Sequence, residues 1–167
     1  QAAADSAAQG SVLVLATEGT VMDGAYQRAL LAVNPKLAVH ARACPLWVAL
    51  AEQGYAEVSQ ESESVAQAVL AHALRGFNQQ PTTVLLGCTH FPVFRTRLQQ
   101  LLGSQVQVID SAQTTAGSVA SALQSEGLLS DRGGNTLFLA TDGEERFQRV
   151  GATFLAESIS DVELVDL

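Results

Sequence analysis

The chain has 167 residues, and 47% of them are hydrophobic, which is enough to bury one well-packed domain with an appendage. Its formal net charge of −8 argues against binding to nucleic acid, because an acidic surface repels phosphate backbones. No apolar run approaches the roughly 20 residues that span a bilayer, so we expect no contact with a membrane.

Short apolar, β-branched runs alternate along the chain with longer segments of helical spacing. The runs expected to form strands are Ser11–Ala16, 37–41, Thr83–Leu86 and 106–109. The segments expected to form helices are Ala25–Val33, 46–53, 62–77, 94–102 and 111–124. Strands that are buried on both faces and separated by helices are typical of parallel sheets with right-handed crossovers. We therefore predict an α/β fold, an open and mostly parallel sheet with helices on both faces.

A polar, turn-rich stretch at 130–134 (SDRGG) indicates a domain boundary. Beyond it we expect a further strand, helix and strand, at 136–140, 144–157 and 162–165. The prediction is a main α/β domain over 11–130, followed by a strand–helix–strand unit over 131–167.

The most informative motif follows the strand at Thr83–Leu86, where Gly87 is succeeded by Cys88, Thr89 and His90. In an open α/β sheet, ligands bind outside the carboxyl ends of the strands, where this triplet is expected to lie. The next helix is expected to begin shortly afterwards, and a helix N-terminus favours the thiolate form of a nearby thiol. His90 is close enough in sequence to hydrogen-bond the thiol or the substrate and to assist proton movement.

On residue chemistry alone, the role of Cys88 stays open. A lone cysteine after a strand is commonly a small buried hydrophobe. A zinc site is disfavoured, because a Cys-x-His pair offers two ligands where zinc takes three or four. Two cysteines, Cys44 and Cys88, are also too few for a disulfide scaffold, and they indicate reduced thiols in a cytoplasmic protein. Asp110, which follows a strand and precedes a helix, is expected to cap that helix.

The segment LLGCTHFPVF at 85–94 resembles the signature around the second catalytic cysteine of the glutamate racemases. Four further segments are similar to that family and occur in the same order. They are LATEGTVMDGAYQRAL at 15–30, ARACPLWVALAEQG at 41–54, VIDSAQTTA at 108–116 and FLATDGEERFQRVGATFL at 138–155. Within the resemblance, His90 favours glutamate over aspartate, because aspartate racemases typically have a glutamate after Gly-Cys-Thr.

The resemblance implies a cofactor-independent racemase, using neither pyridoxal phosphate nor a metal, that converts L-glutamate to D-glutamate for peptidoglycan precursors. In this family two cysteines on opposite faces of the substrate exchange the α-proton. Cys88 matches the second of these cysteines, and His90 matches the histidine that assists it. Positions that bind the substrate are matched by Thr17, Thr20 and Thr89. From the residues alone, Thr17 and Thr20 are equally compatible with turn and N-cap chemistry.

Three further positions take their expected roles from the same resemblance. Glu52 matches a glutamate that orients the catalytic histidine, and a solvated glutamate at a helix end is the alternative. Cys44 matches a cysteine that is buried and not catalytic. Trp47 replaces the family's usual phenylalanine and is expected at an interface or at the edge of a pocket.

The family's first domain, with its DSG-VGG loop and ACNTA motif, has no counterpart in this sequence. We therefore expect 1–10 to be the remnant of a linker helix and 131–167 to pack on a missing N-terminal half. The chain is then a fragment of the racemase, inactive alone and active on glutamate once assembled with that half. The alternatives are a racemase of the aspartate or hydantoin type, and a non-catalytic half-domain that binds partners or forms a homodimer through its exposed surface.

Overall fold

The structure is a computed structural model, and it describes residues 3, 10–56, 60–77, 80–130 and 132–166. Apart from residues 3 and 10, the linker expected at 1–10 lies outside the described residues. The elements up to residue 125 are β1 Ser11–Ala16, α2 Glu18–Asp23, α3 Ala25–Val33, β2 Ala38–Ala43, α4 Pro45–Glu52, α5 Gln60–Ala73, β3 Thr83–Leu86, the 3₁₀ turn η1 Phe91–Phe94, α6 Arg95–Leu102, β4 Gln107–Asp110 and α7 Ser111–Ser125. The elements beyond it are β5 Phe138–Ala140, α8 Glu144–Leu155 and β6 Val162–Leu164.

The main sheet has four strands in the order β2-β1-β3-β4, and all three pairings are parallel. Leu15 of β1 is level with Leu86 of β3, and Leu86 is level with Asp110 of β4. The carboxyl ends of these strands therefore meet along one edge of the sheet. This arrangement confirms the predicted open, parallel α/β sheet.

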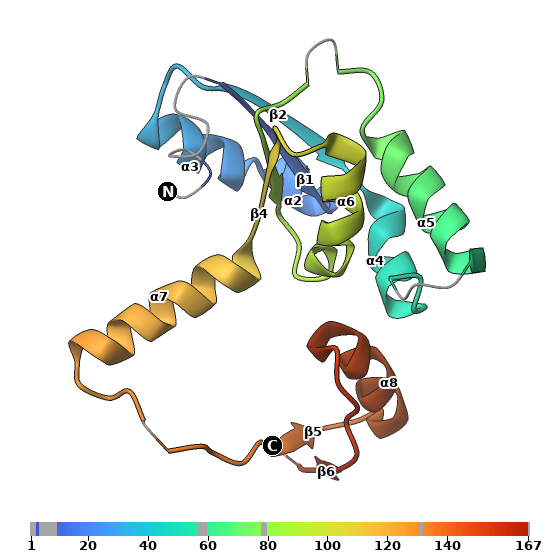
Figure 1. Ribbon diagram of the computed structural model, residues 1–167, viewed down its shortest axis with the longest axis vertical. Helices are drawn as coiled ribbons and strands as arrows, with labels where there is room; N and C mark the ends of the chain where they lie inside the picture. The colour runs from blue at the N-terminus through green and yellow to red at the C-terminus, as the bar shows by residue number, and fades with distance from the viewer. Residues whose placement is uncertain (1–2, 4–9, 57–59, 78–79, 131, 167) are drawn as a thin grey trace.

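Helices cover both faces of the sheet, as predicted. Figure 1 shows α3 on one side, and α4, α5 and α6 on the other. The larger core, between the sheet and α4 to α6, contains Trp47, Phe91 and Phe94, each buried to 1% exposure or less. Complete burial stabilises each such side chain by about 2 kcal/mol. The smaller core places Leu30 of α3 against β1.

Trp47 is a core residue, so its expected position at an interface or pocket edge is wrong. Its ring centroid lies 4.9 Å from that of Phe91 and 6.0 Å from that of Phe94. The tilted and edge-on geometries are the ones that aromatic pairs prefer. The indole packs near the N-terminus of α4 against the 3₁₀ turn.

Most element boundaries lie within two residues of the sequence prediction, and the larger differences are few. A short helix, α2, occupies the segment directly after β1, and β2 extends to Ala43. The helix expected to run to residue 77 ends at Ala73, and Arg42 donates a hydrogen bond of 2.8 Å to the Ala73 carbonyl oxygen. The guanidinium of Arg42 also lies 4.3 Å from the centroid of the Phe77 ring. A cation at the last helical carbonyls ends the helix favourably.

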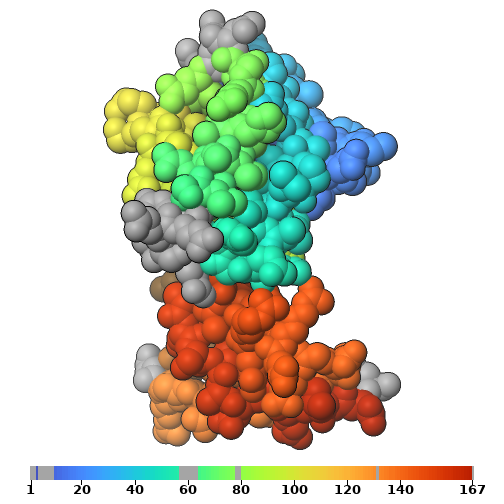
Figure 2. All heavy atoms as spheres, turned by 90° about the vertical axis from the view of Figure 1, so that its right-hand side faces the viewer, coloured from blue at the N-terminus to red at the C-terminus, as the bar shows by residue number. Residues whose placement is uncertain are grey.

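Beyond residue 110, α7 extends away from the sheet, and α8 then contacts α4 and the loop after β3. Figure 1 shows α7 projecting from β4, and the α7 side chains beyond Ser111 are exposed. Two parallel strands, β5 and β6, and α8 form a separate lobe, the predicted strand–helix–strand unit. Figure 2 shows this orange and red lobe against the end of the main body that α4, in teal, occupies. The division into domains at 131 stays a prediction.

None of the helices in the described part of the chain combines the length and hydropathy needed to cross a membrane. The region after α6 nevertheless exposes many apolar side chains, each more than a third accessible to solvent. They are Val119, Leu123, Leu128, Leu129, Leu137, Leu139, Phe147, Phe154, Leu155 and Leu164.

Candidate active site

Cys88 stands at the carboxyl end of β3, where the sequence placed it. The Gly87 amide donates a hydrogen bond of 2.8 Å to the Leu15 carbonyl oxygen, which extends the pairing of β3 with β1. A Cβ atom at Gly87 would lie 2.9 Å from Cε2 of Tyr26 and 3.1 Å from Cβ of Ala16. A side chain at position 87 would require the Tyr26 ring or β3 to shift, and the next residue emerges at the edge of the sheet. The Cys88 thiol is free and half-buried.

A helical segment begins shortly after Cys88, as expected, but its first turn is a 3₁₀ helix, Phe91–Phe94, with His90 as its N-cap residue. The 3₁₀ turn Phe91–Phe94 separates Cys88 from α6, which begins at Arg95. Pro92 lies within the turn, and the Phe91 amide donates to the Cys88 carbonyl oxygen at 3.2 Å.

The imidazole of His90 faces the thiol. Its Nδ1 lies 3.9 Å from Sγ of Cys88 and 3.5 Å from Oγ1 of Thr89, and its Nε2 lies 3.2 Å from Oε1 of Glu52. A carboxylate oxygen only accepts, so Nε2 carries the hydrogen and the Nδ1 of a neutral ring is an acceptor. The tautomer assigned in this way presents a lone pair to the Cys88 thiol.

Glu52 is held in its ionised form. A hydrogen bond from Arg146, with Nη2 2.7 Å from Oε2, is the largest influence lowering the pKa of this carboxyl group. The hydrogen bond from His90 lowers the pKa further. The contact between Glu52 and His90 is the one that the resemblance implied, and it joins α4 to the loop after β3.

The structure also brings three residues of α8 to this pair, and sequence reasoning assigned none of them a role. Arg146 pairs with the Glu52 carboxylate, and Nη1 of Arg149 donates to the Glu52 carbonyl oxygen at 2.8 Å. The ring of Phe154 meets the His90 ring edge-on, with centroids 5.4 Å apart. No local pattern could have identified them, because more than 90 residues separate them from Glu52.

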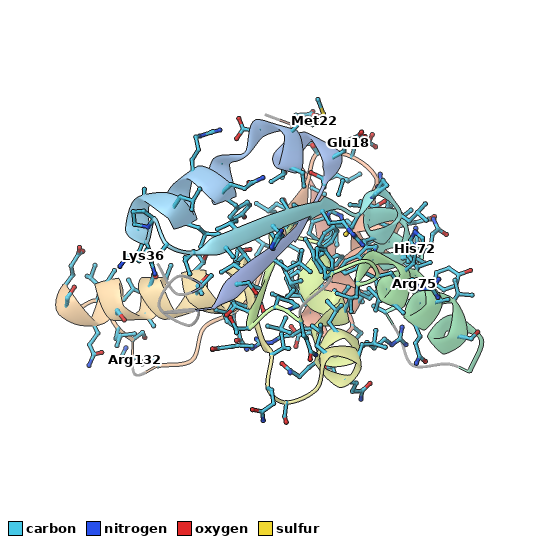
Figure 3. All side chains as sticks on the ribbon, turned by 90° about the horizontal axis from the view of Figure 1, so that it is seen from above. Glu18, Met22, Lys36, His72, Arg75 and Arg132 are labelled. Atoms are coloured by element: carbon cyan, nitrogen blue, oxygen red, sulfur yellow. The ribbon has the colours of Figure 1, made fainter. Side chains whose placement is uncertain are left out.

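Thr17 and Thr20 lie in the segment after β1, at the same edge of the sheet as Cys88. Thr17 is the N-cap residue of α2, but its side chain makes no capping hydrogen bond. Its hydroxyl instead lies 2.9 Å from that of Thr20. Figure 3 shows Glu18 and Met22 projecting outward from the same helix. Both threonines are half-buried, so these hydroxyls form a compact polar pair beside the edge.

Thr89 is exposed, and it opens onto a hollow of about 880 Å³ between the 3₁₀ turn and the end of α8. Pro92 and Val93 line one side of this hollow, and Thr153 and Phe154 line the other. A second hollow, of about 960 Å³, lies between α3 and α7. Of the loop residues Cys88, Thr89 and His90, Thr89 lines the first hollow.

The second cysteine has a different environment. Cys44 is 3% exposed in the larger core, and its Sγ lies 3.7 Å from the Arg42 carbonyl oxygen. Burial raises the pKa of this thiol to about 12. Cys44 is therefore buried and unreactive at neutral pH, as expected.

Asp110 caps α7, as predicted. Its Oδ1 accepts a hydrogen bond of 3.0 Å from the Gln113 amide, and its Oδ2 lies 3.1 Å from Nη1 of Arg95. The described residues contain no group of three or more His, Cys, Asp or Glu side chains that could hold a metal ion.

Comparison with known proteins places this arrangement in a family. The model of the Asp/Glu/Hydantoin racemase family matches residues 1–119. A glutamate racemase of Geobacter metallireducens is 37% identical over 161 residues, which cover 95% of this chain and 58% of that protein. The chain thus spans about three fifths of the length of this relative.

Solved structures agree. A glutamate racemase isoform from Bacillus anthracis has a TM-score of 0.82 and 30% identity, over 99% of this chain and 61% of that one. The glutamate racemase of Francisella tularensis, solved in complex with D-glutamate, has a TM-score of 0.78 and 25% identity, over 96% and 59%. The chain belongs to the Asp/Glu/Hydantoin racemase family.

Proposed function

We propose that this chain is part of a cofactor-independent glutamate racemase and provides one of its two acid/base thiols, Cys88. The observation that carries the proposal is the geometry of that thiol. It is half-buried at the carboxyl edge of a parallel sheet, 3.9 Å from Nδ1 of His90, whose Nε2 is held by Glu52. The similarity to proteins named glutamate racemase supports glutamate as the substrate over aspartate or a hydantoin.

In the proposed reaction, His90 accepts the thiol proton through Nδ1, and the Cys88 thiolate then removes the α-proton of glutamate. The proton passes from the α-carbon to sulfur, and the electron pair stays on the substrate as a carbanion-like state. A second thiol delivers a proton to the opposite face. That thiol is left as a thiolate, which takes up a proton from solvent while His90 releases its own, so no proton is gained or lost over a cycle.

We propose that the hydroxyls of Thr17, Thr20 and Thr89 hold the substrate carboxylates. The pair formed by Thr17 and Thr20 sits where β1 ends, beside the end of β3. Hydroxyl donors fixed in advance stabilise negative charge that develops in the transition state without reorganising at that moment. The exposed Thr89, directly after the thiol, offers a third hydroxyl on the same loop.

The opposite face needs an acid/base group from outside these 167 residues. The chain has two cysteines, and burial with a pKa raised to about 12 removes Cys44 from proton transfer. We therefore propose that the active protein includes the family's N-terminal domain with its own thiol, whether on the same polypeptide or on a partner. A thiol mechanism suits the reducing cytoplasm, and D-glutamate from it would serve peptidoglycan synthesis.

The test is deuterium exchange at the α-carbon. The chain, joined to the N-terminal half, is incubated with L-glutamate in deuterium oxide, and the α-hydrogen signal is followed by NMR. For the assembled protein we expect exchange together with formation of D-glutamate. Neither the 167-residue polypeptide alone nor the assembled C88A variant should racemise glutamate. Aspartate and hydantoins, run in parallel, should not react. Undiminished racemisation by C88A would refute the proposal.

A further inference from the structure

We propose that Arg146 of α8 is a positioning residue for His90, acting through the Glu52 carboxylate to hold the imidazole as the tautomer that faces the Cys88 thiol with Nδ1. The catalytic meaning of this inference rests on the function proposed above. The geometry, in which the Glu52 carboxylate contacts both Arg146 and His90, does not depend on that function.

The Glu52 carboxylate has two oxygens and one partner for each. Oε2 lies 2.7 Å from Nη2 of Arg146, and Oε1 lies 3.2 Å from Nε2 of His90. With both oxygens engaged, rotation of the carboxylate breaks two contacts instead of one. Arg146 therefore directs Oε1 towards the histidine. The same hydrogen bond is the first cause of the lowered pKa of Glu52, which keeps the acceptor anionic.

The neighbouring contacts place α8 over the histidine as well. Arg149, one turn further along α8, donates to the Glu52 carbonyl oxygen, and the Phe154 ring meets the His90 ring edge-on. The side chains of His90 and Glu52 are left 28% and 26% exposed. Water therefore still competes for Nε2, and a directed acceptor decides which tautomer is populated.

A simpler account is that Arg146 only docks α8. Its side chain is 67% exposed, and ion pairs at such positions contribute little to stability. Arg149 provides the matched control, because it comes from the same helix and contacts the same residue, but through the backbone oxygen. A docking role predicts equal effects of R146Q and R149Q on His90. A positioning role predicts an effect of R146Q alone.

The readout is the ¹⁵N spectrum of the histidine rings in the 167-residue chain at about pH 8.5, where an ordinary imidazole is neutral. The three histidines are His40, His72 and His90, and H90Q identifies the signals of the last. We expect separate signals for a protonated Nε2 and an unprotonated Nδ1 in the wild type and in R149Q. In R146Q the two signals should move towards each other as the tautomers mix. R146K, which keeps a cation near Oε2, should retain most of the separation.

Unchanged His90 signals in R146Q would overturn the inference. So would equal changes in R146Q and R149Q, or in R146Q and R146K. In the assembled protein, R146Q should lower kcat about fivefold and change KM by less than about twofold, because it removes orientation and leaves substrate contacts intact. If the assembled protein does not racemise glutamate, the proposed function fails, and the ring spectrum still decides the role of Arg146.

Discussion

Replacing Gly87 with alanine tests the close approach that brings Cys88 to the edge of the sheet. The added Cβ would lie 2.9 Å from Cε2 of Tyr26 and 3.1 Å from Cβ of Ala16, both shorter than an ordinary carbon–carbon contact. The Tyr26 ring must move or β3 must shift. Overpacking of this kind costs about 1 to 3 kcal/mol of unfolding free energy. For a chain of this size, about 2 kcal/mol corresponds to a Tm lower by about 4 to 8 °C.

The assay is urea unfolding of G87A followed by circular dichroism, in a double-mutant cycle with Y26A. Removing the tyrosine ring eliminates the shortest contact, so G87A should cost less in the Y26A background. We expect a coupling free energy of at least about 0.5 kcal/mol between the two substitutions. If G87A is as stable as the wild type, or if the two effects simply add, then the ring does not enforce glycine at this position.

Three further predictions concern the core, the carboxylate and the thiols. W47A should lower the unfolding free energy by about 3 to 5 kcal/mol in urea, because the indole is fully buried, whereas V119A on exposed α7 should change it by less than about 0.5 kcal/mol. Because the pKa of Glu52 is below its usual value of 4.5 in the folded state, its stabilising contribution is present above pH 4.5 and lost as the pH falls through the folded value. The urea midpoint of E52Q should therefore depend less on pH below 4.5 than that of the wild type. Parallel plots of urea midpoint against pH for the two proteins would contradict this. An aromatic disulfide reagent at about pH 8 should modify one thiol quickly in the folded chain and no thiol quickly in folded C88A. Cys44 should react only when the chain unfolds, because it is buried. Fast reaction of two thiols in the folded chain would contradict the burial of Cys44.

The sheet was predictable because its signal is local. Buried, β-branched runs such as Ser11–Ala16 and Thr83–Leu86 are separated by helical spacing, and this pattern permits few arrangements other than parallel strands with crossover helices. The position of Cys88 follows from the same logic, since the residue after a buried strand must emerge at the carboxyl edge. The five ordered segments that resemble the family then indicated which residues to place there.

What could not be predicted depends on contacts between distant segments. The helix after Cys88 begins with a 3₁₀ turn at Phe91–Phe94, so the α-helix α6 starts only at Arg95. Trp47 belongs to the core because α4 packs on that turn, a contact that no periodicity within α4 reveals. The pairing of Arg146 with Glu52 joins residues on α8 and α4 that only the tertiary fold brings together.

The central claim is that Cys88 serves one face of the substrate, and enantiomer-specific exchange tests it most directly. The assembled C88A variant is incubated in deuterium oxide with L-glutamate and, separately, with D-glutamate, and α-hydrogen loss is followed by NMR. The account predicts that exchange persists for one enantiomer, through the remaining thiol, and disappears for the other. Exchange of both enantiomers at wild-type rates would contradict it.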